Sequence, residues 1–96
     1  MEQAQILLTM LKTDLGIRTS TAYDERLGQL LTAAETAIRA EGASTLDASD
    51  PLDQQLIVMY AAWLWRRRDE MGGMPRMLRW ALNNRIFGEK AVTTDG

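Results

Sequence analysis

Apolar residues recur every three or four positions along most of the chain, a spacing that predicts α-helices. The predicted helices cover roughly residues 2–15, 22–41, 51–70 and 75–87. The second separates an apolar from a polar face most clearly, as in a helix that lies on a core. No segment shows the alternation typical of a half-buried strand. The expected fold class is therefore all-α, a small four-helix bundle with a short basic C-terminal helix and an extended tail.

Residues 88–96 are the expected tail, because they follow the last predicted helix and show no periodicity. Residues 1–87 then make a single helical domain, as expected for a chain of 96 residues.

Several helix ends carry recognisable signals. Gly16 stands where a left-handed residue would close the first helix. Thr21 with Asp24 three positions later resembles a capping box at the start of the second helix. Asp50 suits the N-cap of the third helix, and Pro51 suits its first turn.

The third helix is apolar nearly all round, because residues 56–65 contain no charged side chain. A helix of this kind has to be buried on most sides. Three flanking helices can cover most of it, yet a 96-residue chain has only a thin core. Further bulky apolar side chains lie off the predicted core faces, which predicts self-association. These are Ile6, Met10, Trp65, Trp80 and Phe87.

The composition argues against catalysis and against a bound metal. The chain has no cysteine and no histidine, so the commonest nucleophiles, general bases and zinc ligands are missing. The aspartates at 47, 50 and 53 lack the calcium-loop pattern, and helix capping explains them better. We expect a protein that is not an enzyme and that has no cofactor.

Charge is unevenly placed along the chain. Residues 1–50 carry eight acidic and four basic side chains, whereas residues 51–96 carry five acidic and seven basic ones. This distribution favours head-to-tail contacts between copies, and the net charge of −2 is unlike that of a dedicated nucleic-acid binder. The N-terminus has no signal-peptide pattern, and the longest apolar run is about half of a membrane span, so we expect a soluble intracellular protein.

Basic and aromatic residues of the second half are the candidate interface residues, since both types are common in protein interfaces. They are Trp65, Arg66, Arg67, Arg68, Arg76, Arg79, Trp80, Phe87 and Lys90. For the arginine run, the alternatives are a solvated helix end paired with the following acids, Asp69 and Glu70, and contact with DNA phosphates. For the two aromatics of the last helix, the alternative is a rolled helix that buries them. Arg85 is expected to bond free carbonyls at a helix end.

The order of these elements resembles a known family. A short first helix precedes DERLGQLLTAAETAI (24–38), and a loop leads to QQLIVMYAAWLWRRRDE (54–70). A Gly/Pro break then opens GGMPRMLRWALNNR (72–85). Over roughly residues 4–87, this layout resembles the head–tail connector (adaptor) proteins of tailed phages and prophages.

The resemblance implies a structural virion protein at the head–tail interface, made in the host cytoplasm. It also implies a partner-binding role for the tail (88–96), because the C-terminal segment of related connectors often reaches out to the portal. It implies a ring of about twelve copies below the portal protein, closed by contacts between unlike surfaces. Such a ring extends the DNA channel and joins a downstream tail-side protein, and genomic DNA passes without sequence-specific binding. Acidic residues of the first half would line the channel and repel phosphates, with the arginines turned to neighbouring proteins.

Two other interpretations remain. A small helical DNA-binding protein could use the last helix to read bases, through Arg76, Arg79, Asn83 and Asn84. The negative net charge and the lack of helix-turn-helix spacing argue against this DNA-binding interpretation. The third interpretation is a generic dimeric helical module.

Overall fold

The fold is all-α, as predicted, in a computed structural model that describes residues 3–67 and 73–95, with side chains described as far as Glu89. No strand is present in these two stretches. The four helices are α1 (Gln3–Leu15), α2 (Asp24–Glu41), α3 (Pro51–Arg66) and α4 (Arg76–Asp95).

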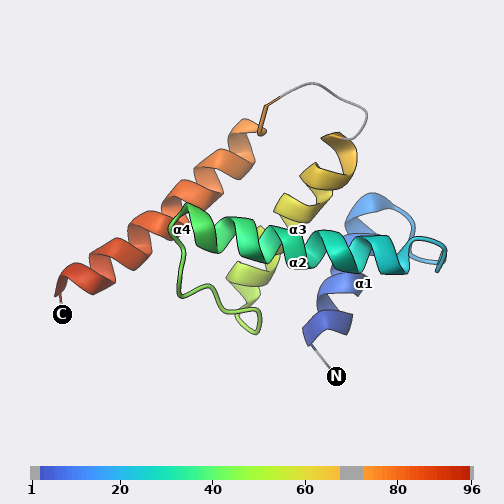
Figure 1. Cartoon of the computed structure of the whole chain (residues 1–96), viewed down its shortest axis with the longest axis horizontal. Helices are drawn as coiled ribbons and strands as arrows, with labels where there is room; N and C mark the ends of the chain where they lie inside the picture. Colours follow the sequence, from blue (N-terminus) through green and yellow to red (C-terminus); the bar gives the residue numbers. More distant parts are fainter. Residues whose placement is uncertain (1–2, 68–72, 96) are drawn as a thin grey trace.

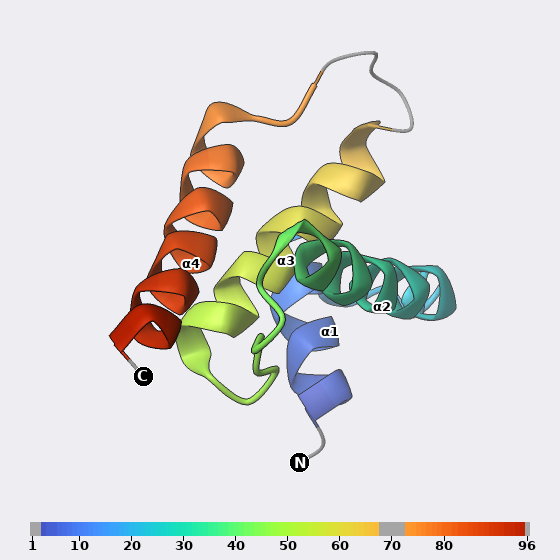
Figure 2. The ribbon, with the colours of Figure 1, turned by 60° about the vertical axis from the view of Figure 1, so that its left-hand side comes forward.

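The central element is α3, which contacts each of the other three helices. Figures 1 and 2 show α2 crossing α3, with α1 on one flank of α3 and α4 on the other. The molecule measures 46 × 36 × 17 Å along its principal axes. Along this thin direction α2 lies over α3, about two helix layers deep, since a helix with its side chains is roughly 10 Å across. A helix in so flat a molecule cannot be covered on every side.

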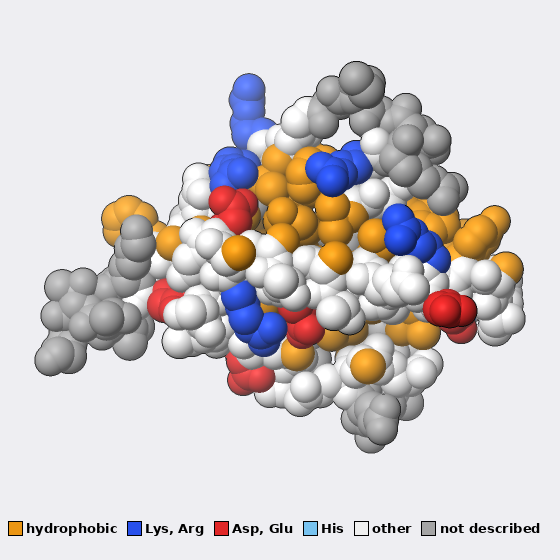
Figure 3. Space-filling model, in the orientation of Figure 1, with side chains coloured by type: hydrophobic (Ala, Val, Ile, Leu, Met, Phe, Trp, Pro, Cys, Tyr) orange, Lys and Arg blue, Asp and Glu red, His pale blue; other side chains and the backbone are white. Residues whose placement is uncertain are grey.

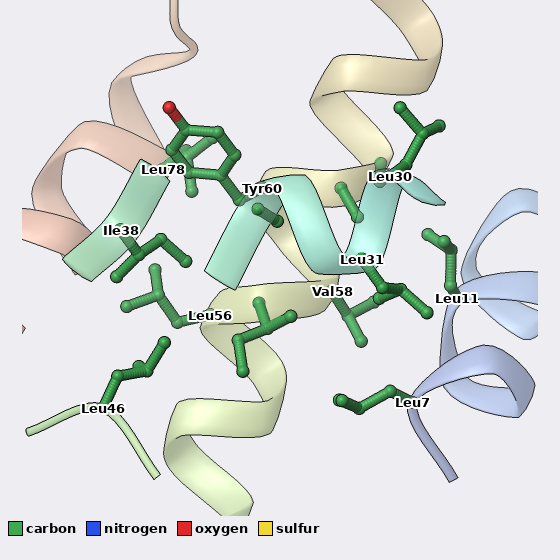
Figure 4. Close-up of a cluster of buried hydrophobic side chains, with 14 of the residues drawn as sticks. Leu7, Leu11, Leu30, Leu31, Ile38, Leu46, Leu56, Val58, Tyr60 and Leu78 are labelled. Carbon is green, nitrogen blue, oxygen red and sulfur yellow. The ribbon is translucent and has the colours of Figure 1, made fainter. Parts of the chain in front are cut away.

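The core lies where the predicted apolar faces meet. Figure 4 shows leucines of α1 and α2 gathered around Leu56 and Val58 of α3, with Leu78 of α4 at the other end of the cluster. Loop residues Ala43 and Leu46 are buried with them, so the loop between α2 and α3 closes one side of the core. The largest fully buried side chains are Leu11, Leu27, Ile38, Ile57 and Leu82.

Two predicted helix ends are confirmed. Gly16 follows α1 with φ +76°, the left-handed conformation that glycine adopts at low cost. At the start of α3, the side chain of Asp50 accepts a hydrogen bond from the backbone N–H of Asp53 at 3.1 Å, and Pro51 is the first helical residue.

The predicted capping box at Thr21 is wrong. Helix α2 begins at Asp24, with Tyr23 at its N-cap and no side-chain hydrogen bond at that cap. Asp24 instead binds Lys12 of α1, with 2.9 Å between Nζ and Oδ1. The carboxylate of Asp24 therefore pairs with a lysine of another helix and does not complete a capping box at the start of its own helix.

The extended tail predicted over 88–96 is wrong in its secondary structure. Helix α4 continues across the expected end at Phe87 to Asp95, which makes it the longest of the four helices. One contact that the sequence pattern does not show supports the extra turns. The carboxylate of Glu89 accepts hydrogen bonds from the side chain of Ser44 and from the backbone N–H of Thr45, both in the loop after α2.

A candidate interaction surface on α3 and α4

One side of α3 is left open, and it carries Leu52, Gln55 and Met59. We call it the open face. Leu52 is 76% exposed, which is unusual for a leucine in the most apolar helix of the chain. Gln55 and Met59 line a hollow toward α4 and another toward α1, and neither hollow includes a residue of α2. The expectation that α3 is buried on most sides is thus confirmed, with one side excepted.

The hollow toward α4 is an apolar groove with a volume of about 550 Å³, which we call the α3–α4 groove. From α3 it is lined by Leu52, Leu56 and Met59, and from α4 mainly by Met77 and Trp80. Its volume and apolar lining are typical of sites that accept bulky apolar groups.

The hollow toward α1 has a volume of about 450 Å³, and we call it the α1–α3 hollow. Met10 of α1 and Val58 and Met59 of α3 supply its apolar lining. Thr9, Thr13 and Asp14 complete the side formed by α1. Methionine side chains adapt their shape to a partner, so a surface that contains Met10 and Met59 can accommodate an irregular apolar ligand surface.

The outward side of α4 is aromatic. Trp80 is 63% exposed and Phe87 is 74% exposed. They stand seven positions apart, so they share one side of the helix. We call Trp80 and Phe87 the outer stripe of α4. The alternative in which α4 rolls to bury both aromatics is wrong, because Leu78 and Leu82 occupy the core instead.

Residues at the end of α3 lie against other parts of the chain. Trp65 is half-buried and meets Tyr23 edge-on, with ring centroids 5.3 Å apart. The guanidinium of Arg67 lies 5.1 Å from the ring centroid of Trp63, in a cation–π arrangement. Arg66 is exposed, with 3.6 Å between its Nη2 and the carboxylate of Asp14.

Some expected contacts lie outside the described residues. These include Arg68 with its proposed partners Asp69 and Glu70, and the side chain of Lys90. Arg76 is described and exposed at the start of α4.

Figure 3 shows basic side chains at the border of an apolar area between α2, α3 and α4, on the face opposite the open face. Basic and apolar groups therefore lie close together on this face.

The charge separation along the sequence is partly cancelled in the fold. Arg66 of the basic half lies beside Asp14 of the acidic half, and Arg79 lies 3.5 Å from the carboxylate of Glu41. These are exposed ion pairs and contribute little to stability. They do reduce the long-range dipole that the sequence suggests.

Arg85 does not bond free helix carbonyls, and the expectation is corrected. Its Nε donates to Oδ1 of Asp53 at 2.7 Å, and one of its terminal nitrogens donates to the hydroxyl of Thr45 at 3.1 Å. Asp53 is 5% exposed and also accepts the backbone N–H of Asp47. The hydrogen bond to Asp53 raises the pKa of Arg85 above its ordinary value, against the opposing effect of burial.

Glu89 extends this polar cluster by one turn of α4. The hydrogen bond from Ser44 lowers the pKa of Glu89 below its ordinary value, helped by Thr45 and by the charge of Arg85. Together, Arg85 and Glu89 fix the rotation of α4 about its axis. That rotation points Trp80 away from the core.

Within the residues that the structure describes, no three or more carboxylates come close enough to hold a metal ion. Among the described helices, none is both long and apolar enough to span a membrane. The exposed groups that the structure brings together are apolar, aromatic and basic, which suits binding to another macromolecule.

The chain matches no model of a protein family, no curated protein and no solved structure. Function is therefore inferred from the surfaces described above and from the layout of the four helices.

Proposed function

We propose that this chain is a structural head–tail connector (adaptor) of a tailed phage or prophage, which forms a ring of about twelve copies below the portal. The observation that carries the proposal is the exposure of four large apolar side chains on α3 and α4. They are Leu52, Met77, Trp80 and Phe87.

Burial of these side chains gives a strong reason for assembly. Trp80 and Phe87 expose on the order of 300 Å² between them, since an aromatic side chain can bury roughly 150–250 Å². At about 25 cal/mol per Å², covering them yields several kcal/mol before the entropy of association is subtracted. Apolar patches of about this size on a monomer are often functional.

The charges suit a channel through which DNA slides. A net charge of −2 gives the duplex no general attraction, whereas a basic lining would hold phosphates through counterion release. The placement of acidic side chains toward the channel and of arginines toward neighbouring proteins stays part of this proposal. Genomic DNA then passes without being read.

The same side chains favour this proposal over a DNA-reading role for α4. Trp80 and Phe87 are the large exposed side chains on the outward side of α4, and Arg79 forms an ion pair with Glu41. A reading helix would present its arginines and asparagines to base edges with few bulky apolar groups between them.

The partners in this proposal are further copies of the chain, the portal protein and a tail-side protein. The C-terminal end of α4 lies at the edge of the molecule, on the side away from α1 (Figure 1). A helix end at an edge of the molecule is well placed to contact a larger protein. The site of action is the virion, after assembly in the host cytoplasm.

The test mixes the purified chain with portal particles and measures native mass and negative-stain images. A ring of about twelve copies below the portal is expected. The double variant Trp80→Gln/Phe87→Gln should fold but bind poorly, because glutamine favours a helix at least as well as these aromatics. Gln29→Ala, on the exposed side of α2, is the matched control and should assemble normally. A dimer that binds duplex DNA with steep salt dependence would instead support the DNA-binding interpretation.

A further inference from the structure

We infer that the ring contact joins unlike surfaces of two copies: the outer stripe of α4 (Trp80 and Phe87) on one copy and the α1–α3 hollow on the next. This inference rests on the proposed function, and it assigns the two surfaces that meet.

The positions of the two surfaces require two copies. Helix α3 lies between α4 and α1, which occupy opposite flanks of the flat molecule in Figures 1 and 2. No residue of α4 lines the α1–α3 hollow, and Trp80 and Phe87 are mostly exposed, so the outer stripe does not fill the hollow of its own chain. A contact between unlike surfaces at opposite flanks repeats from copy to copy and closes a ring when the rotation permits.

The chemistry of the hollow suits aromatic side chains. Met10 and Met59 line it, and thioether groups make favourable contacts with aromatic rings. The two threonine hydroxyls are already satisfied within α1. Thr9 donates to the carbonyl of Gln5 at 3.0 Å, and Thr13 donates to that of Thr9 at 2.9 Å. An incoming apolar group therefore leaves no threonine donor without an acceptor.

Charge favours the α1–α3 hollow over the α3–α4 groove as the acceptor. The exposed residues of α4 between Arg76 and Gly88 include arginines and no acid. The acid of the α1–α3 hollow is Asp14, which is exposed and pairs with Arg66 across 3.6 Å, so it remains accessible to a second cation. The acid of the α3–α4 groove is Asp53, which is buried and held by Arg85.

Charge also disfavours two outer stripes docked on each other. Such a contact would bring Arg76 of both copies to one interface without a described acid on either stripe. Like charges at an interface oppose association.

Disulfide trapping tests this contact cleanly, because the natural chain has no cysteine. The double variant Met10→Cys/Phe87→Cys is assembled on portal particles, oxidised and run on a non-reducing gel. A ladder of covalent multimers is expected, up to the size of the ring. Mixed single variants should give dimers only, and each single variant alone should give none. Thr36→Cys on the exposed side of α2 is the matched control, and with Phe87→Cys it should give no product.

A second pair, Thr13→Cys/Asn83→Cys, guards against a poor geometry at the first pair. Rings in the images without multimers from either pair would overturn the inference and leave the proposed function standing. Covalent dimers from Phe87→Cys alone would also overturn it, because they require two stripes to meet. Absence of rings from the natural chain on portal particles would overturn the proposed function, and this inference with it.

Discussion

The Nε atom of Arg85 lies 2.7 Å from Oδ1 of Asp53, which ties the middle of α4 to the first turn of α3. The two residues are 32 positions apart in the chain. The pair sits at the end of the α3–α4 groove, where both side chains contribute to the lining. It fixes the rotation of α4, and so determines which residues of α4 meet the core and which meet solvent.

Arg85→Ala should destabilise the fold by about 2–4 kcal/mol, because it leaves the buried carboxylate of Asp53 without its cation. Arg79→Ala is the matched control on the same helix. Its partner Glu41 is more exposed and 3.5 Å away, so the cost should stay below about 1 kcal/mol. Chemical denaturation measures the free energy of unfolding of both variants. Equal losses of stability would contradict the conclusion that Arg85 is the cation that pairs with the buried Asp53.

Acid should weaken the contact between Glu89 and the loop after α2. The folded state holds the pKa of Glu89 below its ordinary value of 4.5, mainly through the hydrogen bond from Ser44. Its contribution is therefore present above that pH and is lost as the pH falls through the lower folded pKa.

Glu89→Gln keeps the shape of the side chain and removes the titration. The difference in melting temperature between the natural chain and Glu89→Gln should be largest near neutral pH and should shrink below about pH 4.5. A difference that stays constant from pH 7 to pH 3 would show that Glu89 does not act through its charge.

Two substitutions on α4 should separate its core side from its solvent side. Leu82 is fully buried, so Leu82→Ala should cost about 2–5 kcal/mol of folding stability. Met77 is 69% exposed, so Met77→Ala should change stability by no more than about 0.5 kcal/mol. Thermal unfolding of both variants is the measurement. A large loss for Met77→Ala would mean that α4 is rotated from the orientation described.

Local signals were sufficient to predict much of the fold. The apolar spacing predicts the four helices, and the Asp50–Pro51 start of α3 and the Gly16 end of α1 follow from side-chain chemistry within a few residues. Such local patterns do not predict a structure that depends on a contact with residues distant in the chain. The extra turns of α4 and the pairing of Arg85 with Asp53 both depend on residues more than thirty positions away.

The candidate surface was predictable only in part. The excess of apolar side chains in α3 and α4 is visible in the sequence, and so are Trp80 and Phe87. The sequence does not show which side of α3 stays open, because that depends on how three helices pack around it. The α1–α3 hollow is missed for the same reason, since Met10 and Met59 come together only through packing.

Gly16 and Gly28 should respond to alanine in opposite directions. Gly16 has φ +76°, so Gly16→Ala forces a left-handed alanine and should cost about 1–2 kcal/mol. Gly28 lies inside α2, and a Cβ added there would meet no neighbouring atom within 4 Å, so Gly28→Ala should stabilise the fold by about 0.5–1 kcal/mol. Thermal unfolding measures the change in stability of both variants. A loss of stability in Gly28→Ala would indicate an unseen close contact on α2.

The central claim is that the apolar side chains left exposed on α3 and α4 are covered by other copies in the assembled particle. Hydroxyl-radical footprinting read by mass spectrometry measures this directly on the natural chain. In the free protein, Met77, Trp80 and Phe87 should be oxidised readily, and in portal-bound assemblies Trp80 and Phe87 should be strongly protected. Equal oxidation of Trp80 and Phe87 in the free and assembled states would contradict the claim.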